Sequence, residues 1–203
     1  MDSKANAMSK RAEIMKKYIA DCVETLLVNN TIERISIKDI LTAAEISKAT
    51  FYRYFLDKYD ALNSIYAQEI ERNREKYTSI FEQSFHNLSF LQSRKDFQKA
   101  MLVSAQNSLH DHVSSVSLQQ HLELGRAYYD PNAMPPEIES AIYLYAIGSM
   151  ELSLHWLRTG AKEDASTIIE AQKIAASPLL LEIFSIDAST AALMEREAKR
   201  NNR

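Results

Sequence analysis

Apolar residues recur at helical spacing from Ile14 to Leu27. They come in adjacent pairs, and successive pairs are four residues apart, which places them on one stripe of an α-helix. Charged residues between them, such as Lys16 and Asp21, fall on the other faces. The pattern predicts an amphipathic helix that ends near the pair Asn29-Asn30, because asparagine favours the turn after a helix.

Three shorter helical segments follow this first helix. Ser36 is the predicted N-cap of the first segment, because its hydroxyl and the carboxylate of Asp39 together approach a capping box. Ser47 suits the N-cap of a helix over residues 48–55, and Asp57 suits that of a helix over residues 58–70. Two short helices joined by a tight turn form a helix-turn-helix, whose second helix enters the major groove of DNA.

The helix predicted over residues 48–55 has side chains that suit DNA. Lysine and arginine bind phosphates or guanine edges, tyrosine and threonine hydroxyls bind phosphates, and a threonine methyl can meet a thymine methyl. Backbone N–H groups at the helix starts near Ser36 and Lys58 can also donate to phosphates. On periodicity alone, a helical corner with an aromatic core fits the same residues. The outward positions are Lys48, Ala49, Thr50, Tyr52 and Arg53.

The remainder of the chain also follows helical patterns. Three prolines between residues 130 and 137 predict a loop. The helix expected after that loop, over residues 137–159, is apolar on more than one face, which indicates burial against a partner subunit. The patterns predict helices near residues 77–88, 97–109, 113–125, 137–159, 163–176 and from Pro178 onward.

Composition favours a wholly helical protein. The 203 residues include three glycines and four prolines, and none of these precedes Gly125. Strand-and-turn folds and glycine-rich phosphate loops need such residues, so the sequence excludes a dinucleotide fingerprint and a P-loop. We therefore predict an all-α fold of about nine or ten helices. A helix-turn-helix domain is expected at residues 8–70, and a C-terminal ligand-binding and dimerisation domain at residues 71–203.

Other global features narrow the environment of the protein. Its one cysteine, Cys22, allows neither an internal disulfide nor a cysteine-based zinc site. No apolar run approaches a membrane span and the N-terminus lacks a signal-peptide core, so we expect a cytoplasmic protein without a membrane partner. Residues 1–7 lack an apolar pattern and are expected to form a flexible tail, with Met8 as a second possible start.

The charge balance is permissive for nucleic-acid binding. The whole chain carries a formal charge of −3, yet residues 1–58 contain ten Lys or Arg against eight Asp or Glu. The distribution of charge matters more than its sum for a DNA-binding protein.

The run from Ile35 to Leu62 resembles the DNA-binding domain of TetR-family regulators. It has a hydroxyl before the first short helix at Ser36 and an Ala-x-hydrophobic-Ser turn at residues 44–47. It also has a Thr-Phe-Tyr-x-Tyr-Phe run at residues 50–55 and an Asp-Lys pair at residues 57–58, followed by a leucine. The motif is specific, and the match covers roughly residues 9–70.

The resemblance implies a role for each matched position. Ser36 and Lys58 would hold phosphates, while the outward side chains of residues 48–53 would face the groove. The set expected to contact DNA is Ser36, Ser47, Lys48, Ala49, Thr50, Tyr52, Arg53, Tyr54 and Lys58. The set expected to form the core of the helix-turn-helix is Ile37, Ile40, Ala44, Phe51 and Phe55.

Two residues depart from the family pattern. Glu45 stands in the turn where glycine is usual, and a positive φ there costs a residue with a side chain on the order of 1 kcal/mol. The turn is therefore either strained or slightly different in geometry, and a glutamate facing DNA would repel phosphate. Ala49 also stands where glycine is common, and it adds a methyl group on the DNA side.

Residues 142–160 are similar, more loosely, to the C-terminal domain of TetR regulators common in Firmicutes. Together the two resemblances imply a homodimeric regulator, expected to be a repressor, on a near-palindromic operator, released by an unknown small-molecule effector. The choice between repressor and activator stays open, because it depends on where the operator lies. We expect no cofactor and no enzymatic activity. The expected dimer interface comprises Tyr143, Leu144, Ile147, Gly148, Glu151 and Leu154. The expected ligand pocket comprises Phe81, Phe85, Met101, Tyr145 and Trp156.

Two alternatives stay open at this point. A helical enzyme or metal protein is disfavoured, because His110 and His112 lie on different faces of a helix and neither a zinc-protease motif nor a nucleophile elbow occurs. His121 could be proposed as a further ligand, but no recognised metal-ligand spacing appears. An interaction module that has lost DNA binding is favoured slightly by Glu45 and by the weak positive charge.

Overall fold

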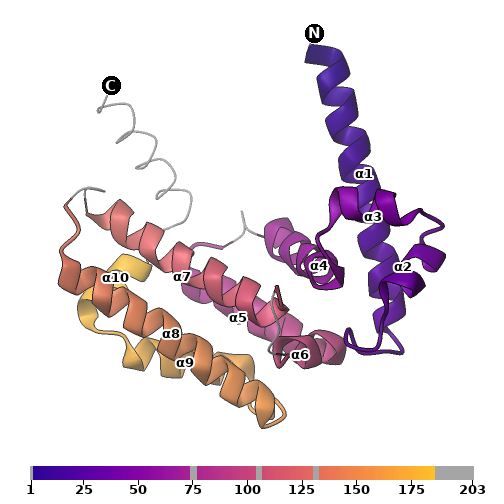
Figure 1. Ribbon diagram of the computed structural model, residues 1–203. Helices are drawn as coiled ribbons and strands as arrows, with labels where there is room; N and C mark the ends of the chain where they lie inside the picture. Colours follow the sequence, from indigo (N-terminus) through magenta and orange to yellow (C-terminus); the bar gives the residue numbers. More distant parts are fainter. Residues whose placement is uncertain (1, 74–76, 104–106, 130–132, 186–203) are drawn as a thin grey trace.

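The computed structural model describes residues 2–73, 77–103, 107–129 and 133–185, and within these ranges it consists of ten helices without strands. The predicted all-α class is therefore confirmed. Four helices form the N-terminal part in Figure 1. These are α1 (Asp2–Leu27), α2 (Ile37–Ala43), α3 (Lys48–Tyr54) and α4 (Lys58–Asn73).

Six helices make up the rest of the described chain. They are α5 (Ile80–Ser93), α6 (Lys95–Met101), α7 (Leu109–Tyr128), α8 (Pro136–Arg158), α9 (Ala165–Ala175) and α10 (Pro178–Phe184). Helices α8, α9 and α10 begin within two residues of their predicted starts, whereas the bounds of α5, α6 and α7 differ more from the predicted patterns.

Several helix bounds differ from the sequence prediction. Helix α5 continues past the predicted end at residue 88 to Ser93, and the helix expected over residues 97–109 is divided, because α6 ends at Met101 and α7 begins at Leu109 after the cap at Ser108. Helix α1 begins at Asp2, so the expected tail over residues 1–7 is wrong for residues 2–7. Helix α7 continues past Gly125 to Tyr128, because that glycine packs inside a helix pair instead of ending a helix. The part of the last predicted helix that runs beyond residue 185 lies outside the described residues.

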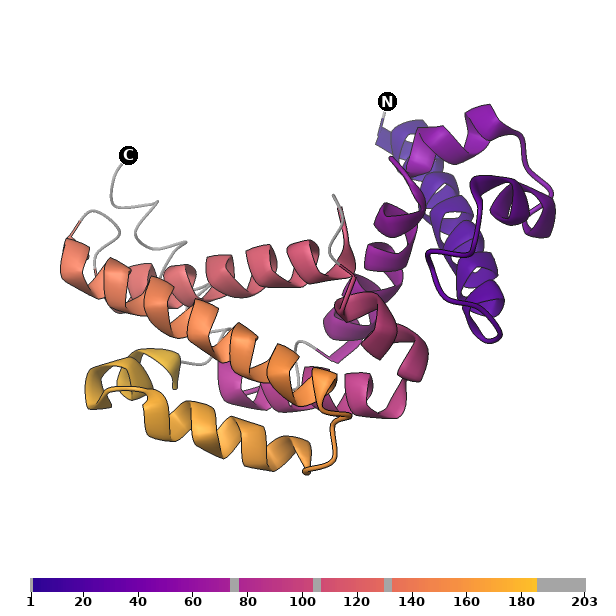
Figure 2. The same ribbon diagram turned by 60° about the horizontal axis from the view of Figure 1, so that its bottom comes forward.

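Helix α4 connects the two groups of helices. It packs against α1, which also contacts α2 and α3, and against α7, which pairs with α8. Figure 2 shows α7 and α8 side by side, with α5, α9 and α10 completing the larger group. The predicted domain boundary at residues 70 and 71 falls within α4, so one continuous helix spans both parts.

Two residues, Asn107 and Arg94, make the polar contacts that fix the junction of the two groups. The Nδ2 of Asn107, just before α7, lies 3.0 Å from Oδ2 of Asp57, just before α4, and the Asn107 carbonyl accepts from Asn63 at 2.8 Å. Arg94, between α5 and α6, binds Glu24 of α1 at 2.9 Å and Asp96 at 2.7 Å. Since the Asn107 contacts and the Arg94–Glu24 ion pair join segments far apart in sequence, they hold the N-terminal helices against the rest.

Gly125 allows α7 and α8 to approach closely. A Cβ at this position would collide with Cδ1 of Ile142 on α8 and would lie 2.9 Å from Sδ of Met134. Ile142 is fully buried, so its side chain has little room to move. Gly148, the glycine within α8, meets nothing within 4 Å and faces outward.

We predict that Gly125→Ala destabilises the protein by about 1–3 kcal/mol, because overpacking outweighs the gain in helix propensity. Chemical denaturation followed by circular dichroism measures this change. Ile142→Val removes the Cδ1 atom that the new methyl meets, so the double variant should be more stable than the sum of the two single changes implies. Strict additivity would show that the contact does not limit the packing.

Candidate functional site

The start of α2 is closed by a complete capping box. The backbone N–H of Asp39 donates to Oγ of Ser36 at 3.2 Å, and the Ser36 backbone N–H donates to the Asp39 carboxylate at 2.8 Å. The Ser36 hydroxyl also donates to that carboxylate, at 2.7 Å, which lowers the pKa of Asp39. The hydroxyl proton is therefore already used within the cap, and Ser36 must turn away from Asp39 to donate to a phosphate.

The turn between α2 and α3 is a Schellman motif with glutamate in place of glycine. The N–H of Ile46 donates to the Leu41 carbonyl at 3.1 Å, and the N–H of Glu45 donates to the Thr42 carbonyl at 3.3 Å. Glu45 has a φ of +51°, so of the two sequence alternatives the strained left-handed turn is the one present. Its side chain is exposed.

Helix α8 ends in the same motif with the usual residue. Gly160 has a φ of +95°, its N–H donates to the Leu157 carbonyl, and the N–H of Ala161 donates to the Trp156 carbonyl. The two helix ends therefore share one hydrogen-bond pattern, but the left-handed residue that follows the C-cap is Gly160 at the α8 end and Glu45 at the α2 end.

Helix α3 divides into a buried side and an exposed side. Phe51 and Phe55 are buried, with ring centroids 5.7 Å apart, and Ser47 caps the helix by accepting from the N–H of Thr50 at 3.1 Å. Exposed on the other side are Lys48, Ala49, Tyr52 and Arg53, while Thr50 and Tyr54 are half-buried and Ser47 is exposed.

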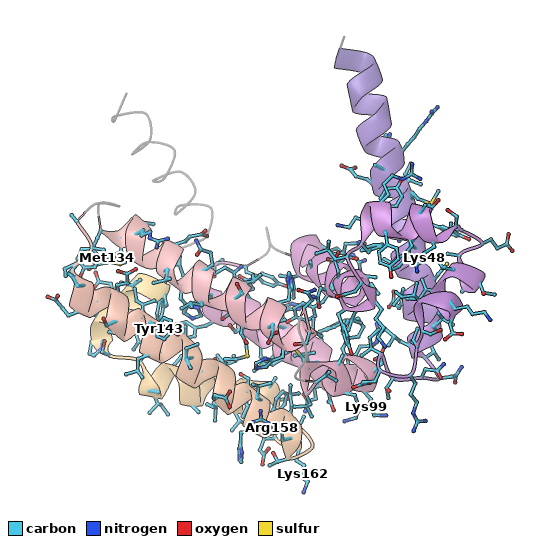
Figure 3. The ribbon with its side chains drawn as sticks, viewed as in Figure 1. Lys48, Lys99, Met134, Tyr143, Arg158 and Lys162 are labelled. Carbon is cyan, nitrogen blue, oxygen red and sulfur yellow. The ribbon has the colours of Figure 1, made fainter. Side chains whose placement is uncertain are left out.

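The exposed side of α3 carries cations next to aromatic rings. Nζ of Lys48 lies 5.8 Å from the centre of the Tyr52 ring, and Cζ of Arg53 lies 5.3 Å from that of Tyr54. Residues 46–56 contain no Asp or Glu, so the helix offers an anion two positive charges without a competing carboxylate of its own. Figure 3 shows Lys48 on the N-terminal group of helices, far from Tyr143 on α8.

Lys58 has a structural task besides the phosphate contact that the resemblance implies. Its Nζ donates to the backbone carbonyls of Glu33 at 3.0 Å and Ile35 at 2.8 Å, which ties the loop before α2 to the start of α4. Partial burial lowers the pKa of its ammonium group, against the opposing effect of the Glu33 and Asp57 carboxylates. One of its three N–H donors is left for a phosphate.

The residues expected to form the helix-turn-helix core lie in or against it. Ile40, Ala44, Phe51 and Phe55 are buried, and Ile37 is half-buried against the same cluster. These five side chains form or contact the buried core on the inner side of α3, and this packing sets the orientation of the exposed side.

The residues expected at a subunit interface lie on α8, and one of them does not reach its surface. Tyr143, Leu144 and Ile147 are exposed apolar side chains, with 75% of Leu144 accessible. Gly148 and Glu151 are exposed as well. Leu154 is fully buried within the protomer, so its assignment to an interface is wrong: it faces the core side of α8.

A cavity opens among α4, α5, α7, α8 and α9. Its empty volume is about 840 Å³, which includes the space at its open mouth. Of the residues expected to line a pocket, Phe81, Met101 and Tyr145 do so. Phe85 is exposed and Trp156 is buried elsewhere, where its Nε1 donates to the Glu163 carbonyl at 3.1 Å, so these two assignments are wrong.

Several polar side chains of the cavity wall were missed by the sequence reasoning. Tyr66, Asn87, His121 and Gln172 all line the cavity. In a helical pattern, polar residues are assigned to the solvent side, and no short motif marks them as cavity residues. Their positions on four different helices become visible only once those helices pack together.

The described ranges hold neither a membrane-spanning helix nor a cluster of metal ligands. In the ranges that the structure describes, no helix is long and apolar enough to cross a membrane. Within the same ranges, no three His, Cys, Asp or Glu side chains gather in a group that could hold a metal ion.

Known transcriptional regulators resemble this chain in sequence and in structure. No model of a known protein family matches the sequence. A curated relative is the "HTH-type dhaKLM operon transcriptional activator DhaS" of Lactococcus lactis subsp. lactis (strain IL1403), 27% identical over 104 residues. The match spans 50% of this chain and 56% of that relative, so this chain matches only about half of the relative's length.

Two solved structures share the arrangement of helices. One is the dihydroxyacetone kinase operon activator DhaS, with a TM-score of 0.54, 19% identity, and coverage of 86% of this chain and 98% of that one. The other is a tetR-family transcriptional regulator from Streptomyces coelicolor, with a TM-score of 0.52, 17% identity, and coverage of 91% and 88%. At such identities the likeness establishes the fold.

We predict that Glu45→Gly raises the free energy of unfolding by about 1 kcal/mol, because glycine adopts the positive φ without a Cβ penalty. Urea denaturation measures the change. Glu45→Ala is the matched control: it removes the carboxylate and keeps the Cβ, so it should gain little. Equal stability of the two variants would show that the charge at this position, and not its backbone, sets the cost.

Proposed function

We propose that this protein, which has the fold of TetR-family regulators, is a transcriptional regulator that binds operator DNA through α3. The observation that carries the proposal is the exposed side of α3, with Lys48 and Arg53 stacked beside tyrosine rings and no acidic residue on the helix. The names of its relatives, transcriptional regulators in each case, support the same function.

In this proposal α3 lies in the major groove. Arg53 and Lys48 bind guanine edges or phosphates, and Tyr52, Tyr54 and Thr50 offer hydroxyls to the backbone. Ser47 and Ala49 are close to the DNA at the start of the helix, where Ala49 presents a methyl group. Ser36 and the remaining donor of Lys58 contact phosphates on either side of the groove.

The protein acts as a dimer in this proposal. Residues 8–70 bind DNA and residues 71–203 regulate and dimerise. The exposed apolar face of α8, formed by Tyr143, Leu144 and Ile147 with the uncovered Gly148 beside it, supports a second copy as its partner. Two copies place two α3 helices about 34–36 Å apart on a near-palindromic operator.

An effector in the cavity regulates the DNA contact. Tyr66 and Ile70, which line the cavity, belong to α4, and α4 begins four residues after α3 ends. A ligand that binds one orientation of α4 better than another therefore shifts the position of α3. The family resemblance suggests a repressor, whereas a relative is named as an activator, so we propose regulation of either sign, set by where the operator lies. It assigns no catalytic activity and no cofactor.

We predict that Arg53→Ala weakens operator binding by about tenfold or more, within the 1–3 kcal/mol typical of a lost base contact, and that Lys48→Ala weakens it less. The operator is first selected from random DNA fragments, and affinity is then measured by fluorescence anisotropy over a series of salt concentrations. Binding should fall steeply with salt, and each lost phosphate contact should reduce that slope by about one.

Lys99→Ala is the matched control for charge. Lys99 is an exposed lysine on α6, away from α3 in Figure 3, so its removal should leave the affinity unchanged. Failure of the wild-type dimer to select any sequence would instead support an interaction module that has lost DNA binding.

We predict that Leu144→Glu shifts the protein from dimer to monomer, because a carboxylate would be buried without a partner in the apolar interface. Sedimentation velocity at micromolar concentration measures the change. Val28→Glu is the control, since Val28 is also exposed but lies at the end of α1. An unchanged dimer in Leu144→Glu would move the interface to another face.

A further inference from the structure

The cavity wall is uncharged. Of its described residues none is Asp, Glu, Lys or Arg, and about half are apolar side chains from α4 to α8. An ion that entered would lose its hydration without finding a counter-charge, which costs several kcal/mol. The wall therefore selects against charged molecules.

Two buried polar atoms of the wall lack hydrogen-bond partners among the described residues. These are Oη of Tyr66 on α4 and Oδ1 of Asn87 on α5. Tyr66 is 4% exposed, and its burial raises the pKa of the phenol, so the hydroxyl keeps its proton at neutral pH. A buried polar atom without a partner costs on the order of 1–3 kcal/mol, and such atoms usually have a reason to be present.

His121 adds an acceptor to the same wall. Its Nδ1 lies 2.7 Å from the Ser117 carbonyl, and because a carbonyl can only accept, Nδ1 carries the proton. Burial lowers the pKa of His121 against the opposing effect of that carbonyl. The ring is therefore neutral, and its Nε2 has a free lone pair.

The other polar groups deep in the wall satisfy one another. Nε2 of Gln172 donates to the Ser149 carbonyl at 3.1 Å and to Oγ of Ser153 at 3.2 Å. The Tyr145 hydroxyl donates to the Gln172 carbonyl at 3.1 Å. This network leaves the Tyr66 hydroxyl as an unused donor, and Asn87 and His121 as unused acceptors.

We propose that the cavity binds an uncharged, mainly apolar molecule that carries a hydroxyl group, whose oxygen accepts from Tyr66 and whose proton is donated to Asn87 or His121. This inference names the effector class of the proposed function and rests on that function only for its regulatory consequence. The apolar part of the molecule lies against side chains such as Phe81, Leu88 and Met101.

The test uses three propylbenzene probes that differ only in the substituent opposite the propyl group: 4-propylphenol (hydroxyl), propylbenzene (hydrogen) and 4-propylbenzoate (carboxylate). Binding to the full-length protein is measured by calorimetry at pH 7.5 without DNA. We expect the phenol to bind about fivefold more tightly than propylbenzene, as one good hydrogen bond gives, and the benzoate to bind at least tenfold more weakly than the phenol.

Tyr66→Phe is the decisive variant. It should lower the affinity for the phenol, and so reduce its advantage over propylbenzene, because the bond from Tyr66 is lost while the bond that the phenol donates to Asn87 or His121 stays. The affinity for propylbenzene should be unchanged. Because the hydroxyl that it removes is unpartnered, the variant should fold at least as stably as the wild type, which thermal denaturation checks. Tyr128→Phe is the matched control: Tyr128 does not line the cavity and its hydroxyl already donates to Glu182, so the ratio of the two affinities should not change.

Three results would overturn the proposal. They are equal binding of the phenol and propylbenzene by the wild-type protein, preferred binding of the benzoate, and no detectable binding of any probe at its solubility limit. The measurement contains no DNA, so a protein that binds the phenol but selects no operator would overturn the proposed function alone. A protein that binds DNA but none of the probes would overturn this inference alone.

Discussion

The carboxylate of Asp57 is the point on which the arrangement of the molecule depends. Its Oδ1 accepts from the backbone N–H of Asp60 at 2.8 Å and thereby starts α4, while its Oδ2 lies 3.0 Å from Nδ2 of Asn107 before α7. One side chain thus fixes where α4 begins and how α4 meets the larger group of helices. The ion pairs of Arg94 with Glu24 and Asp96, with the guanidinium 4.7 Å from the Phe97 ring, support the same junction from its other side.

Much of the fold was predictable because its signals are local. The capping box at Ser36, the caps at Ser47 and Asp57, and the proline at the start of α10 each act within one turn of helix. Helix existence and order followed from periodicity for the same reason. The end of α7 could not be predicted in this way. In the sequence Gly125 resembles a residue that ends a helix, but in the structure it lies inside α7, where its missing side chain makes room for Ile142.

The candidate site was predictable in part. The exposed and buried sides of α3 follow from its own sequence. The predictions for Leu154, Phe85 and Trp156 were wrong, because helical periodicity shows that a residue is apolar but not which element it packs against. The polar wall of the cavity was missed for the complementary reason: Tyr66, Asn87 and His121 come from three helices, and each alone looks like an ordinary partly polar position.

Glu45, the left-handed residue at the end of α2, stands at a position where the side chain can be changed without changing the turn. Glu45 is exposed and its side chain is not needed by the hydrogen bonds that close the helix, all of which come from the backbone. Residues with an unbranched Cβ therefore meet a similar conformational penalty there, which is smaller for Asn and Asp and larger for β-branched residues. A combinatorial library built on this scaffold can randomise position 45 to alter the charge beside α3 while the angle between α2 and α3 is retained.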